Sequence, residues 1–145
     1  MSKLTNKNKA SKRNLGLLAD VDQVGQASKK LTSDERSSVR FKIGLTDALE
    51  NPFTFKKMKQ EGIQGFSSFL SKTVGEKLTI SEVENRFLRT DGPHGPFNKE
   101  TINGTDRQTK HFDNGTRDFR VHGYYNDDGY FCIIRIDPHH RYKFK

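Results

Sequence analysis

Two turn signals near the C-terminus divide residues 108–142 into three short runs and limit what the chain can fold into. The signals are Asn114-Gly115 and Asp128-Gly129, and both dipeptides tolerate the positive φ angles of a type I′ hairpin turn. The runs between them are rich in aromatic and β-branched residues, which favour strands. The sequence therefore predicts a three-stranded antiparallel meander.

The charges on the last two strands indicate how these strands pair. With Asp128-Gly129 as the loop, Arg120 lies opposite Asp137. The alternative loop, Asp127-Asp128, places Arg120 opposite Arg135, and like charges directly opposite each other are destabilising. We therefore expect the first register, which also pairs His122 with Arg135, Val121 with Ile136 and Gly123 with Ile134.

Side chains alternate between the two faces of a strand, so this register assigns each residue to a face. One face is apolar and is the predicted core face; it carries Phe112, Phe119, Val121, Tyr125, Cys132, Ile134 and Ile136. The other face is polar and carries His111, Asp118, Arg120, His122, Tyr124 and Arg135. Asp137-Pro138 ends the last strand, because proline cannot donate to the ladder.

Two helices and one further strand are predicted before the meander. Ser38–Leu45 alternates apolar and polar residues and indicates a half-buried strand that joins the sheet. A helix is expected from Gln60 to Thr73, and a shorter one over residues 79–88, where Ser81 and Glu84 have the spacing of a capping box. The predicted fold is α+β, with an antiparallel sheet of about four strands covered on one face by two helices.

Composition bounds the class of protein. The chain has 145 residues, enough for one domain, and a single cysteine, Cys132. One cysteine supplies neither a disulfide framework nor a thiolate zinc site within the chain, which fits a reducing, cytoplasmic setting. The mean hydropathy is −0.89, no apolar run approaches the length of a membrane span, and the run at 15–19 is too short for a signal peptide. We expect no contact with a membrane.

The net charge of +8 is concentrated in the N-terminal part of the chain. Residues 1–42 hold ten Lys and Arg against four Asp and Glu. We predict a basic flexible arm over residues 1–37, with Lys12 and Arg13 contacting nucleic acid, and one α+β domain over residues 38–145. An excess of positive charge favours a polyanionic partner, RNA or DNA. A merely solubilising basic tail is the alternative.

The polar face of the meander is the candidate for catalysis. His111 and His122 lie on neighbouring strands and face the same way, with Tyr124 beside them and Arg120 and Arg135 around them. Imidazole exchanges protons near neutral pH, and arginine holds phosphate and stabilises added charge on it. These groups suit metal-independent RNA cleavage by the 2′-hydroxyl. The alternative is an ordinary polar face turned to solvent.

The C-terminal tail is the second candidate site. His140, Arg141, Tyr142 and Lys143 interleave cations with an aromatic ring, a pattern typical of contacts with single-stranded nucleic acid. His139 and His140 do not predict a metal site, because adjacent residues of an extended chain point in opposite directions. No metalloprotease, nucleotide-binding or nucleophile-elbow motif is present, and no metal or cofactor is expected.

The last quarter of the chain, RVHGYYNDDGYFCIIRIDPHHRYK, resembles the end of a group of small, uncharacterised bacterial, phage or plasmid proteins. They end in strand, turn, strand and Asp-Pro-x-His, and the group implies no activity. The ending is also similar to that of RelE-like ribosome-dependent ribonuclease toxins. That resemblance implies a phosphate-binding and acid-base role for Arg120, Arg135, His140, Arg141 and Tyr142.

Two functions follow as hypotheses. The first is a basic nucleic-acid-binding protein of a mobile element, acting as a toxin-like ribonuclease and paired with an antitoxin. The second is a non-enzymatic phage or plasmid accessory protein that binds a protein partner through its arm and its Phe-rich surface.

Overall fold

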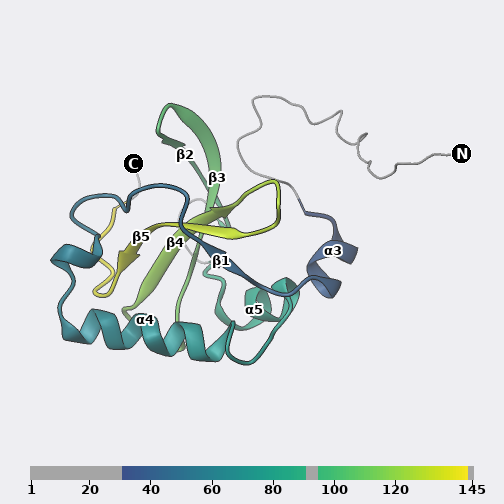
Figure 1. Ribbon diagram of the computed structural model, residues 1–145, viewed down its shortest axis with the longest axis horizontal. Coiled ribbons are helices and arrows are strands. Elements are labelled where there is room, and N and C mark those ends of the chain that lie inside the picture. Colours follow the sequence, from purple (N-terminus) through teal and green to yellow (C-terminus); the bar gives the residue numbers. More distant parts are fainter. Residues whose placement is uncertain (1–30, 91–94, 144–145) are drawn as a thin grey trace, which may run out of the picture.

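The computed structural model describes residues 31–90 and 95–143, which form an α+β fold around one mixed sheet (Figure 1). The strand order is β1-β5-β4-β3-β2, with β1 parallel to β5 and the other neighbours antiparallel. The strands are β1 Ile43–Gly44, β2 Asn98–Ile102, β3 Thr105–Phe112, β4 Arg120–Tyr125 and β5 Phe131–Asp137. The α+β class is confirmed, but the described sheet has five strands and is mixed, where about four antiparallel strands were predicted.

The predicted meander is formed by β3, β4 and β5. Arg120 pairs with Asp137, and His122 pairs with Arg135, as the charges indicated. A register shift follows His122, so Gly123 pairs with Ile133 and not with Ile134. The strands approach so closely there that a Cβ on Gly123 would lie 2.3 Å from the carbonyl oxygen of Cys132, a contact that only glycine avoids.

This shift reverses the predicted faces of part of β5. Ile133 belongs to the main core, whereas Cys132 and Ile134 lie in a second apolar cluster with Tyr124. The prediction that Cys132 and Ile134 face the main core was therefore wrong. A one-residue slip moves side chains to the opposite face of a sheet. The bulge produces that slip on β5 in the part of the strand that pairs with Gly123 and the residues after it.

The type I′ turn lies elsewhere than predicted. Both central residues of such a turn need positive φ. Asn114 and Asp128 do not have it, although Gly115 and Gly129 do. Asn103 and Gly104 have φ of 51° and 81°, and they join β2 to β3 in a hairpin that projects from the body of the molecule (Figure 1). The prediction did not include this hairpin, although Asn103-Gly104 is a turn signal of the same kind as Asn114-Gly115.

The predicted strand Ser38–Leu45 divides its hydrogen bonds between two partners, and only Ile43–Gly44 form a strand. Before it, Phe41 N donates to the carbonyl of Leu78 (2.9 Å). The carbonyl of Lys42 then accepts from Phe131 N (2.8 Å) on β5. Phe41 is buried in the core between these two sets of bonds. The prediction of a strand over all eight residues was therefore wrong, whereas the expectation that this segment joins the C-terminal sheet is confirmed by the pairing of β1 with β5.

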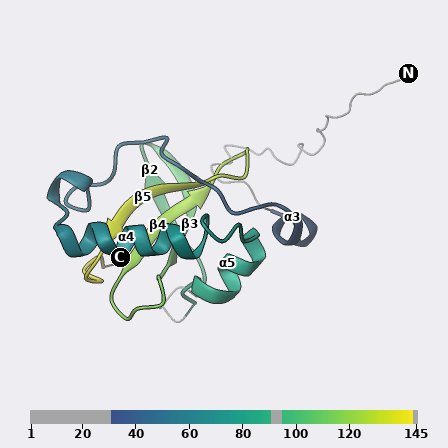
Figure 2. The same cartoon turned by 60° about the horizontal axis from the view of Figure 1, so that its bottom comes forward.

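Two helices cover the apolar face of the sheet, as predicted (Figure 2). They are α4 Gln60–Lys72 and α5 Ile80–Phe87. The capping box of α5 is formed by Thr79 and Glu82, and not by Ser81 and Glu84. The buried side chains on this face include Phe41, Phe69, Ile80, Val83, Phe87, Phe112, Phe131, Ile133 and Ile136.

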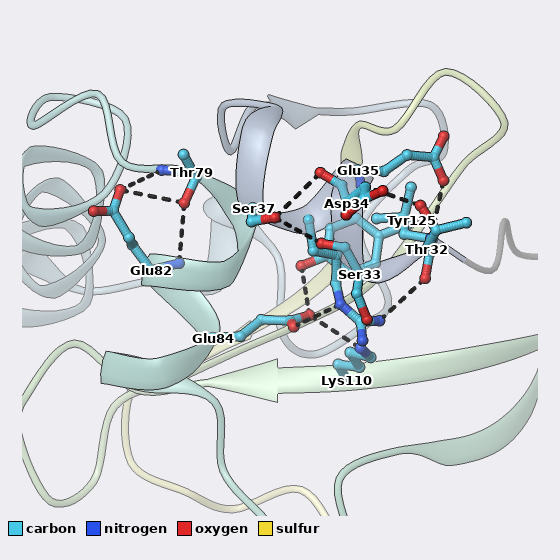
Figure 3. A network of polar contacts seen from close by, with 12 residues as sticks. Thr32, Ser33, Asp34, Glu35, Ser37, Thr79, Glu82, Glu84, Lys110 and Tyr125 are labelled. Atoms are coloured by element: carbon cyan, nitrogen blue, oxygen red, sulfur yellow. Dashed lines mark hydrogen bonds and ion pairs between the residues drawn. The ribbon is translucent and has the colours of Figure 1, made fainter.

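Glu84, which does not form the predicted capping box, connects α5 to three other elements (Figure 3). Its carboxylate accepts from Lys110 Nζ on β3 (3.0 Å) and from the hydroxyl of Tyr125 on β4 (3.0 Å). It also pairs with Arg36 (3.6 Å) on the short helix α3 Ser33–Ser38. Glu84 thus fastens α3 and α5 to the sheet.

Most of the predicted basic arm, with Lys12 and Arg13, lies outside the described residues. Of the part that is described, Leu31 is buried against the core and residues 33–38 form α3. A short 3-10 helix, η1 Phe55–Lys57, precedes α4.

Candidate nucleic-acid interface and a buried polar network

The polar face of the meander is centred on Arg135, whose side chain is fully buried. Its Nε donates to Glu50 (2.9 Å), its Nη2 donates to Glu100, and its Nη1 lies 2.8 Å from His122 Nδ1. The ring of Tyr142 lies over the guanidinium, with its centroid 3.6 Å away, and its hydroxyl donates to Glu100 (3.1 Å). We refer to Arg135, Glu50, Glu100, His122 and Tyr142 as the Arg135 network.

The contact with Arg135 fixes the protonation state of His122. A guanidinium can only donate, so Nδ1 of His122 must accept and the imidazole is neutral. Burial, reinforced by the charge of Arg135, lowers the pKa of His122 well below its ordinary value. The lone pair that a general base would use is therefore engaged by Arg135.

Glu100 remains ionised beside this arginine. Burial alone would raise the pKa of its carboxyl, but the hydrogen bond and charge of Arg135 outweigh burial and lower it. Glu100 also accepts from the hydroxyl of Thr109. Burial would lower the pKa of Arg135, but the carboxylates of Glu100 and Glu50 raise it. The guanidinium and the two carboxylates therefore keep one another in the charged form.

The predicted histidine pair is present but covered. The rings of His111 and His122 stack with centroids 5.1 Å apart and planes at 17°, and both side chains are buried. Tyr142 packs edge-on against His122 at 5.3 Å and against Phe53 at 5.8 Å. The tail and the segment before α4 therefore close over a face that was predicted as an open surface.

Charge also bears on what this face can bind. Arg135 contributes one positive charge, Glu50 and Glu100 contribute two negative charges, and His122 is neutral. A phosphate placed among them would meet a cation that two carboxylates already neutralise. In this conformation the Arg135 network is arranged to hold the fold and not to receive a phosphate.

Two predicted site residues on the sheet have other contacts. The hydroxyl of Tyr124 lies 3.0 Å from Asp47, to which it donates, and its ring packs with the second apolar cluster. Arg120 is buried, and its Nη1 donates to the carbonyl of Phe119 (2.8 Å). The structure therefore brings His111, His122, Arg135 and Tyr142 together and directs the hydroxyl of Tyr124 to Asp47.

The tail prediction leads to a second site, an open groove of about 540 Å³ between the segment 52–62 and the start of the tail. Lys57 and Lys59 line it from the first of these segments and Arg141 lines it from the tail. The remaining lining residues are Pro52, Phe53, Thr54, Met58, Glu61, Gly62, Ile136, Asp137, Pro138 and His139. We refer to this hollow as the tail groove.

Asp137 holds the tail in place beside the tail groove. Its carboxylate accepts from the backbone N–H of Arg141 (2.9 Å) and of Tyr142 (2.8 Å). His140 has a positive φ of 54°, which lets the chain turn back toward Asp137 before Arg141. The side chains of His140 and Lys143 are exposed. His139 pairs with Glu61 at 3.0 Å across the groove.

Sequence reasoning missed four residues of these sites: Glu50, Glu100, Lys57 and Lys59. Glu100 could have been found through the Asn-Gly turn at 103–104, which predicts a strand over β2. Glu50 lies 85 residues from Arg135 in the chain, and no local pattern links them. The two lysines belong to a charged run, Lys56 to Lys59, that has no distinctive spacing.

Comparison of the chain with protein-family models, curated proteins and solved structures gives no match. The resemblances in the C-terminal quarter therefore stay predictions. Within residues 31–90 and 95–143, no helix combines the length and apolar character that crossing a bilayer requires. In the same residues, no three His, Cys, Asp or Glu side chains are grouped as a metal site would need.

Proposed function

We propose that this protein is a nucleic-acid-binding protein of the cytoplasm that holds single-stranded RNA in the tail groove. The observation that carries the proposal is that Lys57, Lys59 and Arg141, cations from two distant segments, line one hollow. Cations spaced along a groove can follow a phosphate backbone, and their pairing with phosphates releases counterions. The overall charge of +8 favours the encounter.

The groove also offers an aromatic surface. Phe53 lines it and is half-buried, with its ring against Tyr142. A base that leaves its stack can pack on such a ring whatever its identity. A combination of cations and one aromatic ring supports binding with little sequence preference, and it suits a single strand better than a duplex, whose bases are already stacked.

Salt-dependent binding tests this proposal. Fluorescence anisotropy with a labelled single-stranded RNA should give a log–log salt slope whose magnitude falls by about 0.7 for each phosphate that a variant no longer neutralises. Lys57→Ala and Arg141→Ala should each reduce the slope. Lys99→Ala, a matched change on the exposed edge strand β2, should leave it unchanged. Equal slopes for all three variants, or no binding at low salt, would reject the tail groove as the site.

Ribonuclease activity is the second candidate function, and the stacked histidine pair beside Arg135 favours it. Catalysis at that pair requires the tail to leave, because Tyr142 covers Arg135, and it also requires Arg135 to release Nδ1 of His122. Tyr142→Ala should then increase cleavage of a mixed RNA pool, with or without ribosomes, and adding His122→Asn should abolish it. If wild type and Tyr142→Ala both leave the RNA intact, the enzymatic function is rejected while binding in the tail groove stands.

A further inference from the structure

One side of α4 carries an apolar strip that the core covers only in part, since Phe66 packs against the core whereas Ile63 and Val74 are exposed. Ile63, Phe66 and Leu70 follow one another at helical spacing, and Val74 continues the series just beyond the helix end. The ring of Phe55 packs on that of Phe66, with centroids 6.0 Å apart, which extends the strip to η1. We call these five residues the α4 strip.

Phe66 and Leu70 of the α4 strip are half-buried, and the other three residues are exposed to a degree that is uncommon for large apolar side chains. Ile63 is 54% exposed, Phe55 46% and Val74 41%. The residues of α4 that turn toward the sheet are different ones. Phe69 is buried in the core, and Cβ atoms on Gly62 and Gly65 would collide with Pro138 and Phe119. A contiguous apolar strip that the core covers only in part is typical of an interaction surface.

Positive charge lies beside the strip. Lys56, Lys57 and Lys59 come just before α4 and are exposed, next to the positive end of the helix dipole. The exposed polar residues within α4 are mostly uncharged, namely Gln64, Ser67 and Ser71, with Glu61 in the first turn. A partner that covers the strip therefore meets more positive than negative charge at its rim.

We propose that the α4 strip is the docking site for an acidic amphipathic helix of another protein. From Ile63 to Val74 the strip is about 16 Å long at the rise of an α-helix, which equals about three turns of a partner helix. Leucine-like side chains at helical spacing would fill the strip, and glutamates on the partner's flanks would reach the lysines. The proposal shares Lys57 and Lys59 with the tail groove, but its central contact, Ile63, does not line that groove.

The test uses the full chain and a synthetic 18-residue helix with leucines along one face and glutamates elsewhere. Isothermal titration should show binding, with at least about tenfold weaker affinity for Ile63→Glu. Gln64→Glu, which adds the same charge at the next exposed position, should cost much less. A thermal melt checks that both variants fold. A peptide with lysines in place of the glutamates should bind at least about tenfold more weakly than the acidic one.

Several outcomes would overturn the proposal. Equal binding of the two peptides, or equal effects of Ile63→Glu and Gln64→Glu, would mean that strip and charge do not act together. Sedimentation that shows a dimer of the chain broken by Ile63→Glu would assign the strip to a second copy. The N-terminal segment contains an apolar run at 15–19 that includes Leu18. If the acidic peptide binds only to the Leu18→Glu variant, the occupant of the strip is this segment of the chain itself.

Discussion

The two faces of the sheet are both buried, but different forces hold them. On the side of α4 and α5, Phe112 packs against Phe131 at 4.9 Å and against Phe41 at 5.6 Å, among aliphatic side chains. On the other side, Arg135 is enclosed by two carboxylates, an imidazole and an aromatic ring. Adjacent residues of β5 thus belong to two kinds of interior.

The difference matters because the two kinds of packing respond differently to change. Apolar contacts are non-directional and depend on the area removed from water, so they are nearly insensitive to pH. An ion pair that is enclosed must keep every partner, since removing one partner leaves a buried charge uncompensated. The polar face should therefore be the more fragile one and the one that senses pH.

Arg135→Met should have the largest effect on stability. It keeps the volume but leaves the Glu100 carboxylate, which is only 12% exposed, without its cation. We expect a loss of about 3–5 kcal/mol in the free energy of unfolding, measured by urea denaturation at pH 7.

Acid separates this loss from a simple loss of packing. In the wild type the pKa of Glu100 is lowered, so its contribution is present above about 4.5 and is lost as the pH falls through the folded-state pKa. In Arg135→Met, burial raises that pKa, and the variant should regain part of its deficit as the pH falls toward 4.5. A deficit that is constant with pH would contradict the charge argument.

His122 should give the next largest effect, as a slope of stability with pH. Its folded-state pKa is lowered, so the unfolded chain binds the extra proton first as the pH falls. The contribution of neutral His122 to the free energy of unfolding is fully present above about pH 6.5. Below that pH, the free energy of unfolding should decline by up to about 1.4 kcal/mol per pH unit. His122→Asn, whose side-chain oxygen can still accept from Arg135, should remove this part of the slope.

His139→Asn is the control for that slope, because His139 is exposed. If His122→Asn and His139→Asn alter the pH dependence equally, the buried neutral histidine is not its source. The measurement is the urea midpoint between pH 5 and pH 7.5.

Ile133→Val should have the smallest effect. Ile133 lies in the apolar core on the other side of β5 from Arg135 and Ile134. Loss of one methylene group should cost about 0.5–1.5 kcal/mol, equally at pH 5 and pH 7. A pH-dependent deficit here would show that the two faces are coupled and not independent.

Local patterns predicted the two long helices and the C-terminal meander well. The helix expected from Gln60 to Thr73 is observed as Gln60–Lys72, because its apolar spacing and the following Gly75 are local signals. The pairing of Arg120 with Asp137 also followed from the sequence, because like charges exclude the competing register. Both inferences needed only neighbours in the chain or across one turn.

Features that depend on distant contacts could not be predicted. The bulge after His122 arises where the backbone of β5 comes too close for any side chain at Gly123, and it decides the faces of Cys132 and Ile134. The burial of His122 and Arg135 depends on Glu50, Glu100 and the returning tail. A polar strand face reads the same in sequence whether water or the chain itself covers it.

The parallel pairing of β1 with β5 has a consequence for how the chain folds during synthesis. Ile43 pairs with Phe131, so the sheet is completed by residues almost ninety positions apart. The hydrogen bond from Arg135 to Glu50 spans a similar separation. Contacts of such long sequence separation must overcome the entropy of closing a large loop, which slows folding. The sheet cannot be completed until β5, which follows the other strands and the helices α4 and α5 in the chain, has left the ribosome. Until then, α4 lacks the strand that it contacts in the folded protein.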